Sequence, residues 1–382
     1  MEAVKVFVLT VIVFGVLIFV HELGHFLACR IFGVKVNEFA IGMGPKLVSV
    51  KGKKSSTVYS IRALPIGGFN NIEEEIPGQR ENAGEEDRDR TSPEYDKYQH
   101  EYGTSDSGGV NAAWGEYTFS SRPVWQRMII IVAGAAMNLL LGLLLMTVVV
   151  LRTENYASTV IYSFYDTETG EEISEYSGLK SGDEIIKVGR RRVHTGDELV
   201  YAVFADGAQN IDITVIRDGE RIVIEDVTFP TGNEAGIVFG IRNFTLYAEK
   251  KNFVNTVKQA FFGSISSMTQ VFDSIKGLIT GKYGIQHISG PIGVGEVIGE
   301  AAKLGLDSVL MISVLLSMNL GIFNLLPIPG LDGGKFVFLA IEGIRRKPLP
   351  RQIEENATLV GMMLLFSLII IVAFKDIFTL VR

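Results

Sequence analysis

Four apolar segments constrain the fold of this chain more than any other feature of its sequence. A helix needs about 20 residues to cross the hydrocarbon core of a bilayer. Segments of about this length or longer occupy residues 6–32, 128–151, 309–326 and 357–374 of the 382-residue chain. Because backbone polar groups must be satisfied inside a lipid core, each segment is predicted to be helical. We therefore expect a polytopic α-helical membrane protein with four transmembrane helices.

The loops between these segments indicate how the chain is oriented. Lysine and arginine are concentrated in residues 30–62 and again in residues 335–351. Such residues are typical of cytoplasmic loops, so both termini and residues 152–300 are expected on the outer side. The first segment could also be read as a signal peptide. Only Lys5 precedes it as a basic residue, however, and no cleavage site of small residues follows its apolar core.

The composition excludes several classes of protein. The formal net charge is −7, and the sequence has no long basic run, which argues against a nucleic-acid partner. Cys29 is the single cysteine, so the chain cannot form an intramolecular disulfide. Hydrophobic residues make up 47% of the chain and are gathered in blocks, which excludes a wholly soluble enzyme.

The first apolar segment carries a polar motif, His21-Glu22-Leu23-Gly24-His25. Residues four apart share one face of a helix, so the two histidines can converge on one metal ion. Imidazole nitrogens suit zinc, and Glu22 can take a proton from water whose pKa the zinc lowers to about 7. Uncompensated charge at the centre of a membrane helix costs about 2.5–3.5 kcal/mol. The alternative, a polar patch packed against another helix, does not explain the spacing.

A second motif follows the third apolar segment, where the sequence reads NLLPIPGLDGG from Asn324 to Gly334. Its prolines and glycines break the helix. Irregular backbone at membrane depth is tolerated only where it lines a cavity or is buried in protein. A metal is a natural partner for the Asp332 carboxylate in this break, and a catalytic zinc usually has three protein ligands. The alternative is a helix-ending turn that Asp332 caps.

The other three histidines fit the role of a third ligand less well. His194 and His287 lie on the outer side by the predicted topology. His100 lies in an acidic segment that would have to fold inward. Asp332 is therefore the preferred third ligand.

Residues 34–110 contain two segments of different character. The strand-like runs at 47–50 and 57–61 surround a Gly/Lys turn and predict a β-hairpin. Residues 71–110 are acidic and nearly free of large aliphatic side chains. Such a segment cannot bury enough surface to offset the entropy of ordering, so we expect it to be flexible.

Residues 152–247 predict a small α+β domain outside the membrane. Thr195 is a plausible cap of a helix, and Asp218-Gly219 is a strong signal for a hairpin turn. Residues 252–280 place apolar side chains at helical spacing among polar ones. They predict an amphipathic helix that lies on the membrane or on the protein.

With both membrane motifs in view, the chain resembles the site-2 protease family of intramembrane zinc metalloproteases. It is most similar to the bacterial branch with a PDZ domain between transmembrane helices two and three, on the evidence of GLKSGDEIIKV at 178–188. The resemblance implies that His21, His25 and Asp332 bind one zinc ion per chain. It further implies that Glu22 is the general base and that Asn324 contacts the substrate backbone.

The predicted hairpin resembles the membrane-associated β-loop of the same family. This resemblance implies that an edge strand can pair with an unwound substrate by β-augmentation. The residues expected to form that strand are Thr57, Val58, Tyr59, Ser60 and Ile61.

The chain departs from the family pattern at two places. Alanine replaces the usual proline within Gly134-Ala135-Ala136-Met137-Asn138. Asn138 is expected either to bond a neighbouring helix, which is the preferred role, or to contact the active-site region. After LPIGGF, Asn70-Asn71 replaces the usual apolar continuation. Neither departure touches a proposed ligand or the base.

The resemblance and the patterns together predict the organisation of the chain. The fold class is a polytopic α-helical membrane protein with a membrane-associated β-hairpin loop and an inserted α+β PDZ-like domain. The expected segments are transmembrane helix 1 (1–33), the β-loop (34–70), the acidic insert (71–122), transmembrane helix 2 (123–151), the extracytoplasmic PDZ-like domain (152–247), an amphipathic helical linker (248–305), transmembrane helix 3 with its broken segment (306–340), a cytoplasmic loop (341–356) and transmembrane helix 4 (357–380).

The function that the resemblance implies is regulated intramembrane proteolysis, the hydrolysis of peptide bonds within or near transmembrane segments. The expected substrates are single-span membrane proteins, for example anti-sigma factors or signal-peptide remnants. The expected location is a bacterial cytoplasmic membrane, with the active site towards the cytoplasmic side and the lipid bilayer as a partner. The alternatives are an inactive membrane adaptor that presents its PDZ domain and an ion transporter. An adaptor does not need Glu22, and a transporter often shows matching broken helices in two halves, whereas only one broken segment is evident here.

Overall fold

The computed structural model describes residues 2–52, 57–72, 118–167, 169–173, 175–234, 236–284 and 288–381. Most of the predicted acidic insert (71–122), with His100, and also His287 therefore lie outside the described residues. The chain divides into two compact units. Unit 1 comprises Met1–Val6, Leu139–Ile322 and Ser367–Arg382, and unit 2 comprises Phe7–Asn138 and Phe323–Phe366.

Among the described residues, four helices are long and apolar enough to cross a membrane. They are α1 (Glu2–Ile31), α3 (Val124–Arg152), α7 (Leu306–Leu325) and α9 (Arg351–Val381). Large apolar side chains on them stay exposed, as with Phe7 on α1 and Phe366 on α9. Such a surface suits contact with lipid chains. The prediction of a multi-pass α-helical membrane protein is confirmed at this level.

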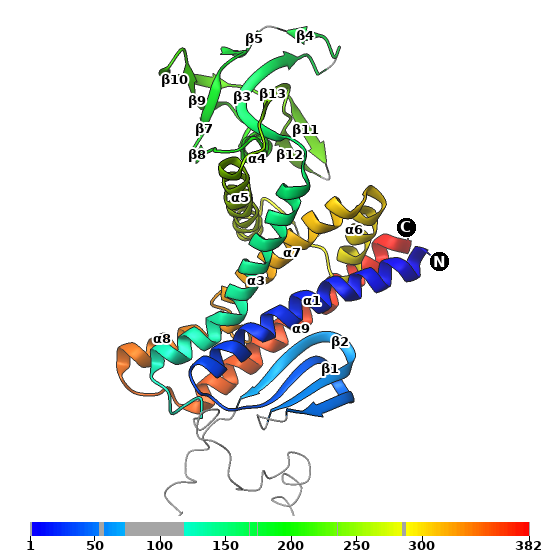
Figure 1. The fold of residues 1–382 in the computed structure, drawn as a ribbon, viewed down its shortest axis with the longest axis vertical. Coiled ribbons are helices and arrows are strands. Elements are labelled where there is room, and N and C mark those ends of the chain that lie inside the picture. Colours follow the sequence, from blue (N-terminus) through cyan, green and yellow to red (C-terminus); the bar gives the residue numbers. More distant parts are fainter. Residues whose placement is uncertain are drawn as a thin grey trace, which may run out of the picture. The chain divides into compact units, whose positions relative to one another are not determined.

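Unit 2 contains a small sheet of two long, bent strands, β1 (Val36–Lys51) and β2 (Val58–Ile72), which lie beside α1 (Figure 1). Positive φ angles at Gly42 and Gly44 mark the bend of β1, and a positive φ angle at Gly67 marks the bend of β2. The predicted hairpin is confirmed, with Val50 opposite Tyr59 and Lys51 opposite Val58.

The predicted edge strand at Thr57–Ile61 is wrong. Residues 58–61 lie opposite residues 38–41 of β1 on one side and opposite residues 48–51 on the other. Because β1 folds back on itself, its two halves enclose this part of β2. The backbone of Val58–Ile61 therefore pairs within the sheet and has no free edge for a substrate. Alternating strand patterns in a sequence do not say which strand becomes the interior one.

The core of unit 2 forms where α1, the sheet and α3 meet. Phe26 and Cys29 from α1 pack with Phe39 from β1 and Ile130 from α3, and all four are buried. The chain then continues after α7 through a broken segment into α8 (Asp332–Arg345). Arg127 on α3 forms a two-pronged ion pair with Glu342 on α8, which joins these two helices.

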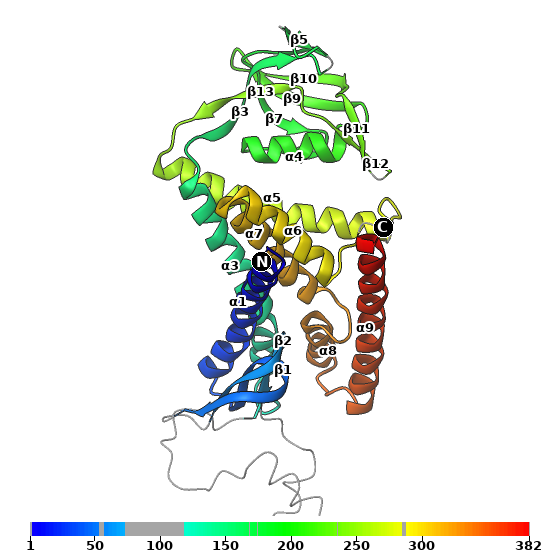
Figure 2. The same cartoon turned by 90° about the vertical axis from the view of Figure 1, so that its right-hand side faces the viewer.

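Unit 1 contains a seven-stranded sheet with one helix, α4 (Gly196–Asp206), across one face (Figure 2). The main path runs β10-β9-β7-β3-β13, with β4 beside β3 and β8 beside β7. The capping box of Thr195 and the turn at Asp218-Gly219 are confirmed. The strands are β3 (Tyr156–Tyr165), β4 (Glu172–Ile173), β5 (Glu175–Tyr176), β6 (Leu179–Lys180), β7 (Glu184–Val188), β8 (Arg191–Arg192), β9 (Ile211–Arg217), β10 (Glu220–Val227), β11 (Thr231–Glu234), β12 (Ile237–Gly240) and β13 (Phe244–Glu249).

The predicted amphipathic helix is present in unit 1 as α5 (Phe253–Ile279). Phe253, Val257 and Phe261 remain exposed, while small residues on the opposite face are buried. A further helix, α6 (Pro291–Leu304), begins at Gly290 without a side-chain cap of its own. Asp376 of α9 takes that place, because its carboxylate accepts hydrogen bonds from the backbone N–H groups of Gly290 and Gly293.

Candidate metal centre

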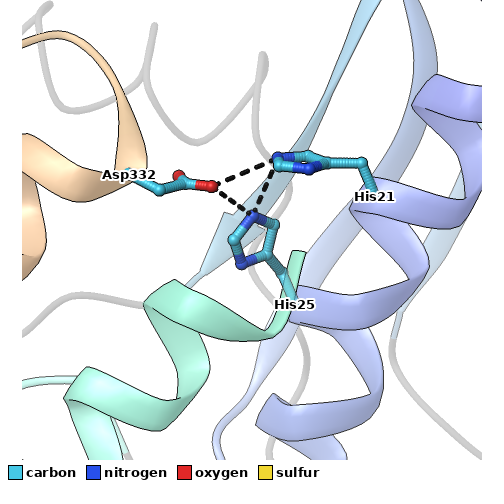
Figure 3. Close-up of side chains that lie close together, drawn as sticks. All are labelled: His21, His25 and Asp332. Carbon is cyan, nitrogen blue, oxygen red and sulfur yellow. Dashed lines mark hydrogen bonds and ion pairs between the residues drawn. The ribbon is translucent and has the colours of Figure 1, made fainter. Parts of the chain in front are cut away.

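His21 and His25 lie one turn apart on α1 and point to the same side of the helix (Figure 3). Their Nε2 atoms are 3.2 Å apart. The spacing of four residues produces this convergence directly, because it returns the chain to the same helix face. Side-chain exposure is 12% for His21 and 10% for His25, so both imidazoles are largely withdrawn from solvent.

Asp332 joins the two histidines from the opposite side of the site (Figure 3). It is the first residue of α8, directly after the broken segment that contains Pro327 and Pro329. Gly330 completes the turn with a φ of 98°. Oδ2 of Asp332 lies 3.2 Å from Nε2 of His21 and 3.3 Å from Nε2 of His25.

The positions of these three atoms suit a shared metal ion better than hydrogen bonds among the three side chains. Oδ2 of Asp332 is buried, and within the described part of the chain no hydrogen bond of acceptable geometry satisfies it. The three ligand atoms are 3.2–3.3 Å apart. Tetrahedral zinc with bonds of about 2.0–2.1 Å places its ligands about 3.3–3.4 Å from one another. Two imidazoles and one carboxylate are also a donor set that zinc accepts.

The other ring nitrogens are held by α3. Nδ1 of His25 lies 2.8 Å from the backbone carbonyl oxygen of Ile130, which can accept its hydrogen. The amide of Asn138 lies 3.2 Å from Nδ1 of His21. An amide can turn its oxygen to this position. An imidazole that uses Nε2 for a metal needs such an acceptor, because Nδ1 then carries the hydrogen. Asn138 of α3 therefore both contacts a neighbouring helix, α1, and reaches the candidate site.

A glycine on α3 makes room for His25. A Cβ atom at Gly134 would overlap Nε2, Cδ2 and Cε1 of the His25 ring. Only a residue without a side chain leaves that space open. Gly134 thus controls how closely α3 approaches the imidazole.

Glu22 lies beside the two histidines and is buried, with an exposure of 8%. Its Oε2 accepts a hydrogen bond of 2.8 Å from Nδ2 of Asn70 on β2. Gly68 allows the strand to pass this close, since a Cβ there would lie 2.8 Å from Cγ of Glu22. The arrangement brings a carboxylate that can move a proton next to a set of metal ligands.

Asn324 and the strand residues are the remaining candidates from the sequence. Asn324 lies on the last turn of α7, partly exposed, before the broken segment. Thr57 and Ser60 are buried in the sheet, where Thr57 Oγ1 donates to the carbonyl of Val36 and Ser60 Oγ donates to Glu38. Ser60 therefore serves the internal bonding of the sheet.

Sequence reasoning overlooked three contributors, namely Asn70, Gly134 and the carbonyl of Ile130. Asn70 did carry a signal, because it replaces an apolar residue directly after LPIGGF. A backbone carbonyl carries no sequence signal.

Comparison with known proteins places this arrangement in a family. The model of "Peptidase family M50" matches residues 9–368. The regulator of sigma-W protease RasP of Bacillus subtilis is 30% identical over 96% of this chain and 97% of its own length. Two proteins that carry zinc metalloprotease names are each 32% identical. That of Clostridium perfringens aligns over 97% of this chain and 98% of its own length, and that of Fusobacterium nucleatum over 98% and 99%.

The match spans both membrane motifs and nearly all of the chain, and the aligned relatives are themselves covered almost completely. The expected resemblance is confirmed: the chain belongs to peptidase family M50, the site-2 proteases, and is a zinc metalloprotease.

Proposed function

We propose that the protein is an intramembrane endopeptidase that hydrolyses peptide bonds within or near the transmembrane segments of single-span membrane proteins. In this proposal His21, His25 and Asp332 hold one zinc ion, and Glu22 is the general base. The observation that carries it is the convergence of three ligand atoms within 3.3 Å of one another beside a buried carboxylate. Two of the ligands and the base belong to a helix long and apolar enough to cross a membrane.

The chemistry divides between the metal and the side chains of the chain. Zinc supplies a Lewis acid that polarises carbonyl oxygens and lowers the pKa of water from about 15.7 to about 7. Glu22 accepts a proton from the attacking water and delivers it to the nitrogen of the leaving amine, so the carboxylate is regenerated. His21 and His25 are kept in place by α3, through Asn138 and the carbonyl of Ile130.

A substrate has to present an extended backbone at this site, because a helix hides its carbonyl groups in hydrogen bonds. Residues 69–72 of β2 offer a sheet edge for such a segment. They pair with β1 on one side, and the described residues supply no second strand on the other. Asn70 lies on this edge and contacts Glu22. We infer that the substrate pairs there and that Asn324, at the end of α7, contacts its backbone.

The finer architecture and the orientation belong to the same proposal. Residues 152–247 are assigned as an extracytoplasmic PDZ-like domain, which agrees with one helix across a sheet of short strands. The basic loops at 30–62 and 335–351 place the active site towards the cytoplasmic side of a bacterial membrane. The other domain limits follow the sequence prediction.

The printed name of one relative narrows the class of substrate. The Bacillus subtilis protein is named as a protease that regulates sigma-W. Membrane-anchored regulators such as anti-sigma factors are therefore proposed as substrates, with signal-peptide remnants as a second source of single-span segments.

The test is cleavage of a model single-span substrate by detergent-purified Glu22→Gln. The variant removes the base and keeps the size of the side chain, so cleavage should fall about 10²–10⁴-fold while zinc is retained. Glu355→Gln makes the same change on an exposed part of α9, where Glu355 pairs with Arg351, and should cleave normally. Normal cleavage by Glu22→Gln would contradict the proposal. An inactive wild type that binds zinc would favour an adaptor, and transport of zinc into vesicles would favour a transporter.

A further inference from the structure

Asn70 holds Glu22 through two hydrogen bonds. Its Nδ2 donates to Oε2 of Glu22 at 2.8 Å and to the backbone carbonyl oxygen of the same residue at 2.9 Å. A side-chain amide nitrogen has two hydrogens, so both are directed to Glu22. Among the described residues, Asn70 is the one whose side chain hydrogen-bonds the Glu22 carboxylate.

We propose that Asn70 is a positioning residue that fixes which oxygen of Glu22 faces the reacting water. The proposal rests on the assignment of Glu22 as the general base. With Oε2 engaged by Asn70, Oε1 is the oxygen left to accept the proton. Asn70 itself touches neither the metal ligands nor the reacting atoms, so it acts through Glu22.

The backbone carbonyl of Glu22 determines which way the amide of Asn70 lies. A carbonyl oxygen can only accept a hydrogen bond. The oxygen of Asn70 therefore cannot take the place of its nitrogen beside this carbonyl. The same orientation directs the other hydrogen of Nδ2 to Oε2 of Glu22. The orientation is set by the backbone carbonyl, so the amide restrains the carboxylate whatever the charge of that carboxylate.

The path of β2 makes this contact possible. Gly68 and Asn70 are two residues apart and share one face of the strand. A Cβ at Gly68 would lie 2.8 Å from Cγ of Glu22, so the strand passes directly against this side chain. Asparagine is short enough to reach Oε2 from so close a backbone.

The two polar atoms of the Asn70 amide differ in their partners. Oδ1 of Asn70 is buried and has no hydrogen-bond partner within the described part of the chain. Within that part of the chain, the side chain of Asn70 therefore bonds through Nδ2 alone, and both of its bonds go to Glu22.

Asn356 supplies a matched control. It is the same residue type, and it is exposed on α9. It belongs neither to the candidate metal centre nor to the proposed substrate edge.

The kinetic test compares Asn70→Leu, Asn70→Asp and Asn356→Leu with the wild type on a single-span model substrate. Leucine is close to asparagine in size but cannot donate a hydrogen bond. Aspartate places a carboxylate, which accepts hydrogen bonds, against the two acceptor oxygens of Glu22. Both Asn70 variants should lower kcat about 10–100-fold. Their KM, zinc content and thermal midpoint should stay close to those of the wild type. Asn356→Leu should match the wild type in all four measurements.

A second readout does not depend on activity. In zinc-free protein labelled with ¹⁵N-asparagine, the side-chain NH₂ signals of Asn70 are those that Asn70→Leu removes. These signals should shift on Glu22→Leu and stay in place on Asn356→Leu.

Two results would overturn the inference. One is unchanged kcat in both Asn70 variants while Glu22→Gln is inactive, which would leave the proposed function intact. The other is loss of zinc or of thermal stability in step with the loss of activity, together with NH₂ signals that ignore Glu22→Leu. If Glu22→Gln cleaves normally, the proposed function fails first.

Discussion

Unit 2 contains two buried polar clusters, and they are completed in different ways. In the first, Glu38 of β1 accepts hydrogen bonds from Ser60 at 2.5 Å and Arg62 at 2.9 Å, and Lys46 lies 3.1 Å away. Every oxygen of this carboxylate faces a donor from the same sheet. In the second, Oδ2 of Asp332 faces two imidazole nitrogens, and all three atoms are potential metal ligands.

The comparison separates a cluster that stabilises the fold from one that is suited to bind a metal ion. Burial by itself would raise the pKa of Glu38, but hydrogen bonds from Ser60, Arg62 and Lys46 outweigh it and hold that pKa below the usual range. The chain thus supplies its own counter-charges in the sheet. At the candidate metal centre the chain supplies acceptor atoms that need a cation. A chelator should therefore affect the cluster around Asp332 and not the cluster around Glu38.

A substitution that crowds the candidate metal centre should have a larger effect than one in the Glu38 cluster. In Gly134→Ala, the new Cβ would overlap the ring of His25 and force α3 or the imidazole to move. We expect zinc affinity to fall about 10–100-fold, as for changes to groups that orient a ligand. Competition with a chromophoric chelator measures this affinity. Gly15→Ala, on the same kind of apolar helix with open space around it, should bind zinc like the wild type.

Removal of the charge at Glu38 should affect stability and leave zinc binding unchanged. Glu38→Gln leaves Arg62 and Lys46 without a counter-charge and should destabilise the sheet by about 1–3 kcal/mol. Hydrogen exchange of β1 and β2 amides measures this loss. Zinc loss in step with faster exchange would show that the two clusters are not separate.

Low pH should destabilise the β1–β2 sheet as Glu38→Gln does, but to a smaller extent. The folded-state pKa of Glu38 is lowered, so its contribution is fully present above the unfolded value of about 4.3. It is then lost as the pH falls through the lower folded-state pKa. The protection factors of β1 and β2 amides, which correct for the intrinsic exchange rate at each pH, should therefore fall below about pH 4 in the wild type and much less in Glu38→Gln. An equal fall in both proteins would assign the effect to other groups.

The sequence was sufficient to predict the membrane helices and the convergence of the two histidines. Long apolar runs and a spacing of four residues are local patterns, and each has one simple structural outcome. Asp332 was also accessible, because a carboxylate in a proline-rich break requires a partner. Its distances to His21 and His25 were not accessible, since they depend on how α8 packs against α1.

The sheet shows where local reasoning stops. The pattern around Val50 and Tyr59 predicted a hairpin, and that pairing is present. It did not predict that β1 bends at Gly42 and Gly44 and pairs with β2 a second time. This second pairing removes the free edge at Val58–Ile61. It also brings Asn70 to Glu22, a contact between residues 48 positions apart that no periodic pattern encodes.

The most direct test of the account is the zinc content of detergent-purified protein, compared between the wild type, His25→Ala and Glu38→Gln. We predict about one zinc per chain in the wild type and in Glu38→Gln, and none in His25→Ala. Full zinc in His25→Ala would contradict the assigned site. So would a monodisperse wild type, handled without chelator, that holds no metal.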